Sequence, residues 1–210
     1  MIENSIFSRN VNGMTEILTR SCIGIAGCGG LGSNAAVALV RAGIGKLILA
    51  DFDNVEMSNL NRQYFFLNQV GTKKVDALAN NLKSINPEVE LEIFNKKIDP
   101  ESIQKIFGSV DLLIEAFDKA ESKKWLIEKW SINNPDKPVI SGNGVSGMGN
   151  NESLITTKMG DIYFCGDGVS ELSMGLCGAR VAIVANMQAN LAIELLMEKK
   201  KEIKPRINTD

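Results

Sequence analysis

The chain contains no histidine among its 210 residues. It therefore has no Ser-His or Cys-His catalytic pair, no imidazole general base and no histidine metal ligand. The groups that remain for catalysis are carboxylates, lysines, arginines, backbone dipoles and a bound metal. Such groups can align charged substrates and stabilise negative charge, and we expect chemistry of that kind.

Cysteine, long apolar runs and net charge are also scarce. The four cysteines include no Cys-x-x-Cys pair, the spacing typical of tetrahedral zinc sites; they are Cys22, Cys28, Cys165 and Cys177. No apolar run reaches the length of a membrane span, and the N-terminus lacks a charged-then-apolar signal. We therefore expect a cytoplasmic protein with free thiols and no membrane association. The net charge of −2 leaves no basic stripe for nucleic acid.

What the chain does contain is a regular alternation of short apolar runs and helical stretches. At 210 residues, with 44% apolar residues, it is long enough for one domain, 1–210, with a full core. The alternation predicts an α/β fold with a doubly wound, largely parallel sheet. The expected strands are 22–26, 46–50, 89–94, 110–116, 137–141 and 152–156, with another starting at 161, and the expected helices are 34–42, 73–85, 99–107, 121–131 and 179–198. Apolar residues occupy nearly every face of the last helix, so we expect it to be buried all round.

A glycine-rich turn joins the first expected strand to the first expected helix. Its glycines are Gly27, Gly29, Gly30 and Gly32, and Asp51 follows the next strand nineteen residues later. Glycines let a phosphate approach the backbone, and a helix N-terminus offers unpaired N–H groups. An acid at Asp51 can accept hydrogen bonds from ribose hydroxyls. This arrangement predicts a Rossmann-like, nucleotide-binding βαβ unit.

Two cations beyond Asp51 bear on which nucleotide binds. Arg62 lies in a polar, amide-rich segment, and Lys74 opens the helix that follows. A guanidinium and an ammonium near the glycine turn suit a triphosphate better than a nicotinamide. The alternative is that both are solvated surface charges, as most arginines and lysines are.

The motif Asp-Phe-Asp-x-Val-x-x-Ser-Asn-Leu-Asn-Arg-Gln runs from Asp51 to Gln63. It resembles the ubiquitin-activating-enzyme-like (ThiF/MoeB/HesA) superfamily, above all its short, zinc-free, thiamin-type adenylyltransferases. The resemblance extends from Ser8-Arg9 to the final helix. It implies an enzyme that binds ATP and Mg²⁺ and adenylates the C-terminal Gly-Gly carboxylate of a small ubiquitin-like sulfur carrier, releasing pyrophosphate, in thiamin biosynthesis. Because the carboxylate is already ionised, this reaction needs no base.

The resemblance also implies roles for individual residues. Gly30 and Asp51 correspond to the phosphate-turn and ribose contacts, and Lys74 to the lysine that binds the triphosphate. The segment that ends in Arg62 corresponds to the phosphate loop, and the motif adds Asp53 to the nucleotide-binding residues. The other loop residues counted there are Ser58, Asn59 and Asn61.

Two further residues have a structural alternative beside their implied role. Asp118 falls where relatives keep a magnesium-linked aspartate, although it could instead be the N-cap of the next helix. Arg9 corresponds to an arginine that a neighbouring subunit inserts into the site, which implies a homodimer; alternatively it belongs to a frayed terminus without a role. Lys119 departs from the pattern, because relatives usually have asparagine there.

The cysteines mark another departure. Many relatives bind zinc through two Cys-x-x-Cys pairs, so we expect no zinc here. Cys177 and Cys28 are expected to pack in the interior, although Cys28 near a helix N-terminus could be somewhat acidic.

The glycine-rich loop 142–149 could let a Gly-Gly tail reach the nucleotide. Two alternatives stay open: adenylation of another substrate (a molybdopterin-type carrier, a tRNA base or a peptide), and an NAD-dependent oxidoreductase.

Overall fold

A computed structural model describes residues 5–203 of the chain, with side chains described as far as residue 199. Within this range the strands form one seven-stranded sheet in the order β3-β2-β1-β4-β5-β7-β6. All neighbours pair in parallel except β6 and β7, which are antiparallel. The predicted α/β fold with a largely parallel sheet is confirmed. The strands are β1 Cys22–Ala26, β2 Lys46–Ala50, β3 Glu90–Phe94, β4 Leu112–Glu115, β5 Val139–Gly142, β6 Ile155–Met159 and β7 Ile162–Gly166.

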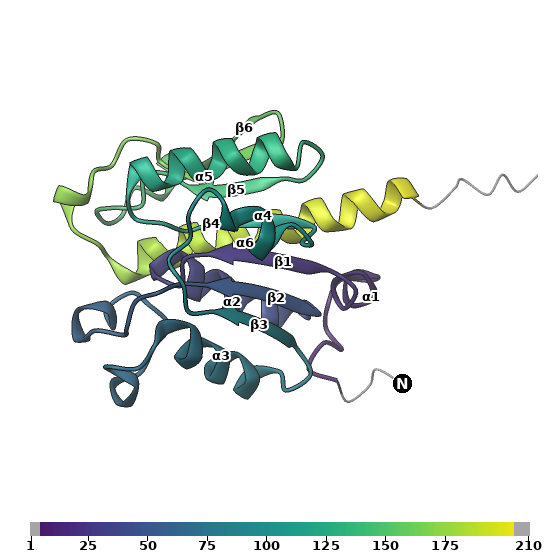
Figure 1. The fold of residues 1–210 in the computed structure, drawn as a ribbon, viewed down its shortest axis with the longest axis horizontal. Helices are drawn as coiled ribbons and strands as arrows, with labels where there is room; N and C mark the ends of the chain where they lie inside the picture. The colour runs from purple at the N-terminus through teal and green to yellow at the C-terminus, as the bar shows by residue number, and fades with distance from the viewer. Residues whose placement is uncertain (1–4, 204–210) are drawn as a thin grey trace, which may run out of the picture.

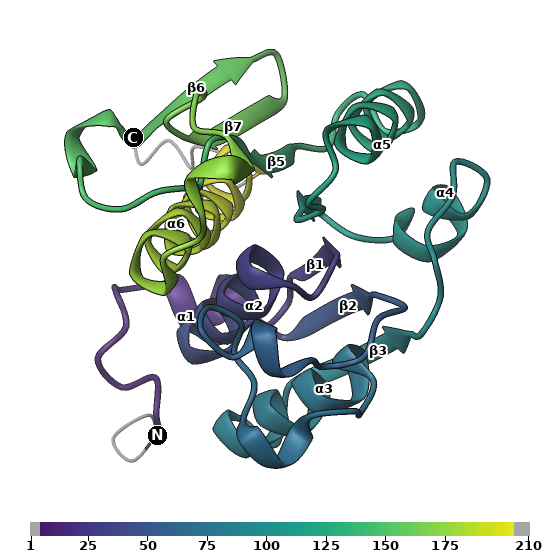
Figure 2. The ribbon, with the colours of Figure 1, turned by 90° about the vertical axis from the view of Figure 1, so that its left-hand side faces the viewer.

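Helices cover both faces of the sheet (Figures 1 and 2). One layer contributes to the larger apolar core and contains α1 Met14–Leu18, α2 Gly30–Ala42, α3 Lys74–Ile85 and α6 Gly178–Ile203. The other layer packs over a smaller core and contains α4 Ser102–Phe107 and α5 Ala120–Asn133. Helices on both faces bury the central strands, which explains why β1, β2 and β4 read as nearly continuous apolar runs.

Helix α2 lies at the centre of the larger core and packs along α6. It ends where Gly43 adopts a left-handed conformation, with φ of 102°, and donates its N–H to the carbonyls of Leu39 and Val40. Its other end begins at the glycine turn that follows β1. The N-terminus of α2 therefore lies at the edge of the sheet where the parallel strands end.

Helix α6 differs from its prediction, because it is not buried all round. Val184 and Gln188 are fully buried, whereas Ile183 is 38% exposed and Glu194 is exposed. One side of α6 packs on α2 and β5, and the opposite side is open. Among the described residues, the segment Gly178–Lys199 of this helix is long and apolar enough to cross a membrane by length and composition alone.

One helix was not predicted, and one strand has other bounds than predicted. Helix α1 is a single short turn whose apolar residues pack under α6. Strands β6 and β7 form a hairpin across Gly160 and Asp161, and β6 starts at Ile155, three residues later than predicted. All five residues of β6 are exposed, so the strand has no buried side that an alternating apolar pattern could reveal.

Candidate active site

The candidate site lies where the order of the strands reverses. Strand β1 is between β2 and β4, and Ala26 at its end pairs with Ala50 on one side and with Glu115 on the other. The loops that follow these three strands therefore leave the sheet side by side. Ligands of open α/β sheets bind at such a switch point, outside the carboxyl ends of the strands.

The glycine turn is tight for reasons visible in its geometry. Gly27 has φ of 97°, a value that favours glycine, and donates its N–H to Ala50 O at 2.9 Å. A Cβ at Gly32 would lie 1.9 Å from Gly27 O, so no other residue fits there. The first bond within α2 is from Ser33 N–H to Gly29 O, so the preceding N–H groups of the helix lack a partner inside it. They form an anion-binding end.

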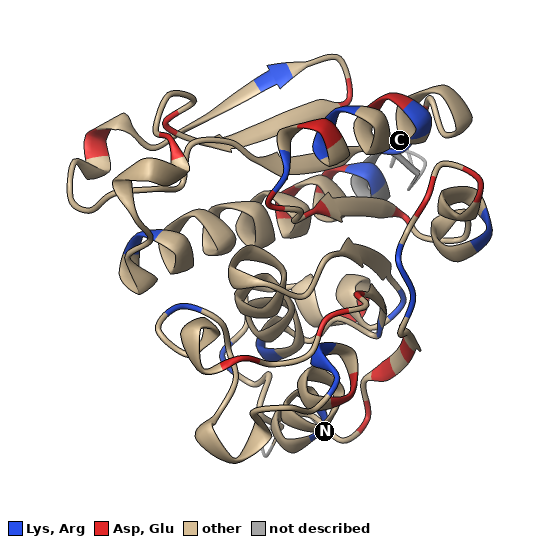
Figure 3. Ribbon diagram, turned by 60° about the vertical axis from the view of Figure 1, so that its left-hand side comes forward, with Lys and Arg blue, Asp and Glu red and all other residues tan. Residues whose placement is uncertain are grey.

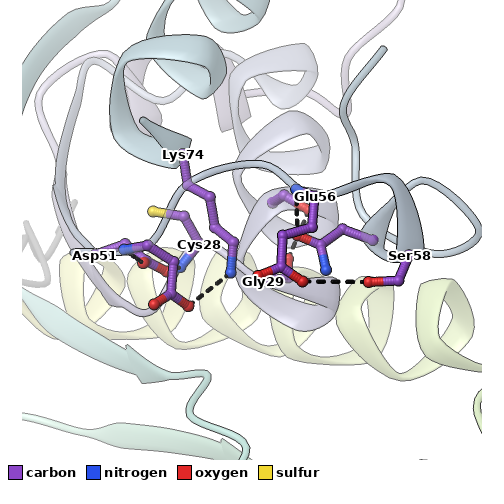
Figure 4. A network of polar contacts seen from close by, with 9 residues as sticks. Cys28, Gly29, Asp51, Glu56, Ser58 and Lys74 are labelled. Atoms are coloured by element: carbon purple, nitrogen blue, oxygen red, sulfur yellow. Dashed lines mark hydrogen bonds and ion pairs between the residues drawn. The ribbon is translucent and has the colours of Figure 1, made fainter. Parts of the chain in front are cut away.

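Asp51 closes this turn from β2. One carboxylate oxygen accepts the Cys28 N–H at 2.6 Å, and the other accepts the Asp53 N–H at 2.8 Å (Figure 4). Burial raises the pKa of Asp51, although these two N–H groups oppose the rise. Each oxygen has a second lone pair, so Asp51 can hold the turn and still accept a ribose hydroxyl.

Cys28 is fully buried in the core, as the packing interpretation predicts. Its burial raises the pKa of the thiol well above the usual value, and the nearby Asp51 carboxylate adds to the rise. The alternative of a somewhat acidic thiol at the helix N-terminus is therefore wrong.

Lys74 is not a solvated surface charge. Its side chain is only 8% exposed, and Nζ lies 2.9 Å from an Asp53 carboxylate oxygen. The backbone N–H of Lys74 also donates to Asp53 O, at 3.0 Å, so the first turn of α3 is fixed to the loop after β2. The surface alternative is wrong for Lys74, and Figure 4 shows its ammonium directed toward the loop that contains Asp51.

Arg62 lies beside the N-terminus of α2. The residue is half-buried, and its guanidinium makes two exposed hydrogen bonds, to Ser58 O at 2.9 Å and to Asn61 Oδ1 at 2.8 Å. Its carbonyl accepts the side-chain amide of Asn34 at 2.9 Å, and its aliphatic stem lies next to Gly30. The segment that carries Arg62 is therefore attached to the first turns of α2.

The polar residues before Arg62 differ in their exposure and in whether their side chains already hold the loop together by hydrogen bonds. Ser58 is exposed, and its hydroxyl donates to Glu56 at 3.3 Å. Asn59 is buried, and its side-chain oxygen accepts the Glu56 N–H at 3.0 Å, so this amide already holds the loop together. Asn61 is exposed and donates to Leu176 O at 3.3 Å, just before α6.

Asp118 follows β4 by three residues and is exposed, with no hydrogen bond or ion pair among the described residues. Helix α5 begins at Ala120 with Lys119 at its N-cap, and no side chain caps it, so the N-cap interpretation of Asp118 is wrong. A free carboxylate suits Mg²⁺, which takes one or two carboxylates and completes its shell with phosphate oxygens and water. The described residues contain no group of three or more acidic or cysteine side chains that could hold a metal by themselves.

Arg9 is not brought to this site within its own subunit. It is exposed in a segment of turns, and the next residue, Asn10, donates to Ala42 O at 2.8 Å at the C-terminal end of α2. The 13 residues of α2 span about 20 Å, so the glycine turn lies far from Arg9. The segment is attached to α2 rather than frayed.

Two buried ionic groups were missed by the sequence interpretation. Glu115, on β4, is fully buried and pairs with Lys123 at 2.9 Å. Arg180, at the start of α6, is 4% exposed and pairs with Asp167 while also donating to the carbonyl of Gly149. A glutamate inside an otherwise apolar strand was a signal for the first group, and no sequence pattern marks the second.

Comparison with known proteins supports the resemblance. The model of the ThiF family matches residues 5–209. Ubiquitin-like modifier-activating enzyme 5 of Bombyx mori is 35% identical over 145 residues, which cover 60% of this chain and 37% of that protein. The same enzyme of Drosophila erecta is 49% identical over 83 residues, covering 40% of this chain and 21% of that protein. The chain thus spans well under half the length of these curated relatives.

Solved structures share the fold. The E. coli tRNA N6-threonylcarbamoyladenosine dehydratase TcdA, in complex with ATP, superposes with a TM-score of 0.82 at 22% identity, covering 91% of each chain. E. coli MccB with ATP gives a TM-score of 0.69 at 20% identity, covering 87% of this chain and 57% of MccB.

Proposed function

This chain belongs to the ThiF family, and from that premise we propose that it adenylates the C-terminal Gly-Gly carboxylate of a small ubiquitin-like sulfur carrier. The proposed substrate is a carrier of the thiamin type, since the 210 residues contain no Cys-x-x-Cys pair of the kind that zinc-binding relatives have. ATP is the co-substrate and pyrophosphate the second product. Because the reaction consumes ATP, we place it in the cytoplasm.

The observation that carries the proposal is the buried ammonium of Lys74. A lysine that is 8% exposed has lost most of its hydration, and only one of its three N–H donors is used, by Asp53. Its charge adds to that of Arg62, whose segment is attached to the first turns of α2, and to the positive end of the α2 dipole. A triphosphate uses this charge, whereas a nicotinamide dinucleotide has less need of it.

The reaction requires alignment and charge stabilisation. The Gly-Gly carboxylate attacks the α-phosphorus, a new C–O–P bond forms, and the bond from the α-phosphorus to the bridging oxygen of pyrophosphate breaks. Negative charge on the β- and γ-phosphates is balanced by Lys74 and Arg62, and backbone N–H groups of the glycine turn bind phosphate oxygens. Asp51 fixes the ribose and hence the direction of attack.

Asp118 is the residue we propose to hold Mg²⁺, since its carboxylate is exposed and free of protein partners among the described residues. The ion, when bound, would supply a positive charge that neutralises the phosphates. Asp51 is a poorer ligand, because both of its oxygens already accept N–H groups.

The acceptor is inferred from two supports. The curated relatives are named for activating a ubiquitin-like modifier, and a glycine-rich loop that follows β5 contains Gly144, Gly147 and Gly149, all with positive φ. Such a loop could lie beside an extended Gly-Gly tail. We also propose a homodimer in which Arg9 acts in the partner's site, because it lies far from the glycine turn of its own subunit.

Acceptor-dependent exchange of labelled pyrophosphate into ATP tests the proposal. The acceptor is a small Gly-Gly-ending protein encoded in the same genome, and the matched control is that protein without its last glycine. Exchange with the intact acceptor and none with the truncated one supports the proposal. If a tRNA or a short peptide stimulates the exchange and the Gly-Gly protein does not, that molecule is the substrate. Oxidation of NADH without any exchange would overturn the proposed adenylation.

A further inference from the structure

A polar network centred on a fully buried carboxylate joins the segments on either side of Asp118. Its centre is Glu115, the last residue of β4, whose side chain is 0% exposed. One carboxylate oxygen accepts the Phe117 N–H at 2.6 Å. The other accepts the Lys123 ammonium at 2.9 Å and the Ser141 hydroxyl at 2.6 Å.

The three donors come from the segments that surround Asp118. Phe117 is its immediate neighbour in the chain, and Lys123 lies in the first turns of α5, which begins two residues after Asp118. Ser141 is on β5, the next strand of the sheet. One buried carboxylate therefore ties together both flanks of the Asp118 loop and the strand beside it.

Asp118 has no such ties of its own. Its side chain makes no hydrogen bond or ion pair among the described residues, and α5 has no side-chain N-cap. The position of its carboxylate thus depends on the backbone on either side. On the N-terminal side that backbone is held by the Phe117 N–H, and on the C-terminal side by Lys123.

A buried ion pair is a costly way to gain stability. Removing two charges from water offsets most of their attraction, and well-packed apolar residues of similar volume are often as stable. Stability alone therefore does not explain why an ion pair is found at this position. The charge-assisted bonds of Glu115 are short and directional, which suits the task of fixing a loop.

We propose that the Glu115–Lys123–Ser141 network positions Asp118 for the nucleotide-bound Mg²⁺. The inference rests on the proposed function of Asp118, and Glu115 is a positioning residue that does not touch the ligand. Partners that hold a metal-binding carboxylate in place typically change metal affinity by about 10- to 100-fold when they are removed.

The test uses ATP alone as the probe, so it needs no acceptor. Calorimetry gives the Kd of ATP with EDTA and with Mg²⁺, and the ratio of the two measures how much the ion strengthens binding. We expect a ratio well above one for the wild type and close to one for Asp118→Asn. The paired variant Glu115→Met/Lys123→Met removes both charges together, so no unpaired charge stays buried, and we expect it to lower the ratio by about 10-fold or more.

A double-mutant cycle identifies the route of the effect. If Glu115 acts through Asp118, adding Asp118→Asn to the paired variant causes no further loss of the ratio. Hydrogen exchange of the Phe117 amide, measured without nucleotide, should accelerate in the paired variant. The matched control is Asn134→Ala, which breaks a partly buried hydrogen bond to Gln104 at the opposite end of α5 and should leave the ratio unchanged.

The outcomes separate the two proposals. If the folded paired variant keeps the wild-type ratio and Asp118→Asn lowers it to about one, the positioning role is overturned and the proposed Mg²⁺ role of Asp118 stands. If the ATP affinity of the wild type does not depend on Mg²⁺, or if Asp118→Asn keeps the wild-type ratio, both the positioning role of Glu115 and the Mg²⁺ role of Asp118 are overturned. If the paired variant fails to fold, Ser141→Ala takes its place, because it removes one hydrogen bond and keeps the ion pair; a wild-type ratio there counts against the proposal.

Discussion

Asp51 and Lys74 are charged side chains that the protein buries beside a glycine turn. Lys74 is compensated by Asp53, and Asp51 by two backbone N–H groups. Such compensation is necessary because an unpaired charge at this depth would be strongly destabilising. It also places both side chains in fixed positions before any ligand arrives, and this preorganisation is what charge stabilisation requires.

We expect the wild-type protein to bind ATP-Mg²⁺ more tightly than NAD, and Asp51→Ala to weaken ATP binding by roughly 1–3 kcal/mol, the usual value of a hydrogen bond to a charged group. Calorimetric titration with each nucleotide measures both quantities. Circular dichroism of the variant shows whether the overall fold survives. Equal or tighter binding of NAD would contradict the proposed nucleotide.

At the scale of single elements, α2 depends on how closely it packs against the turn that precedes it. A Cβ at Gly32 would lie 1.9 Å from the carbonyl oxygen of Gly27, whereas a Cβ at Gly29 would meet nothing closer than 3.7 Å. The two glycines are three residues apart in the same turn, yet only one of them is sterically required. Alanine substitutions at Gly32 and Gly29 therefore form a matched pair of variants.

We expect Gly32→Ala to destabilise the protein strongly, by more than about 3 kcal/mol, because backbone atoms must move. Gly29→Ala should preserve the fold. Chemical denaturation of both variants measures the difference. Equal stability of the two would show that the turn is more adaptable than its geometry indicates.

The pair of Arg180 and Asp167 joins α6 to the loop after β7. Burial opposes ionisation of Asp167, but hydrogen bonds from Ser170, Val169 and Arg180 outweigh it and hold the pKa below the usual 3.8. The ionised carboxylate therefore stabilises the fold above the unfolded-state pKa. This contribution is lost as the pH falls through the lower, folded-state pKa.

We expect Asp167→Asn to lower the free energy of unfolding at pH 7, since it leaves the buried Arg180 charge unpaired, by about 3–5 kcal/mol. The loss should shrink as the pH falls below 3.8 toward the lower, folded-state pKa of Asp167, because the wild type then loses the same stabilisation. Urea unfolding at a series of pH values measures this, with Glu90→Gln on the exposed edge of the sheet as the control. A difference that stays constant with pH would contradict the assigned pKa shift.

Most elements were predictable from the sequence because their burial is periodic or continuous. β1, β2 and β4 are buried on both faces, and α3 has one apolar side, so these patterns persist in the sequence. The exposed β6 has no such pattern, and its predicted bounds lie three residues too early; the single turn of α1 was not predicted at all. Glu115 stands out as a charge inside an apolar strand, but the sequence does not identify its partner Ser141 on another strand. No local pattern marks the pair of Arg180 and Asp167.

At the scale of the whole molecule, charge is spread rather than gathered. Figure 3 shows basic and acidic residues interspersed along α5 rather than separated, and the net charge is −2. The proposed site is local: it draws its cations from Arg62 and Lys74, and we propose that a third cation comes from another subunit. Arg9, at the far end of α2, is the candidate.

We expect Arg9→Ala and Asp118→Asn each to abolish adenylation, and their mixture to recover part of the activity. In a mixed dimer, one site would contain both an intact Asp118 and an intact Arg9 from its neighbour. Adenylation in the mixture, with sedimentation of each variant as the control for assembly, measures this. Mixtures that stay inactive, or a fully active monomer, would contradict the shared site.

The formation of carrier-AMP tests the proposed adenylation most directly. Intact-mass spectrometry follows a Gly-Gly-ending carrier incubated with the protein, ATP and Mg²⁺, beside the carrier lacking its last glycine and beside the Asp118→Asn protein. The proposed reaction predicts one added AMP on the intact carrier, release of pyrophosphate, and no adduct in either control. An unmodified carrier, or an adduct that forms equally well with Asp118→Asn, would contradict it.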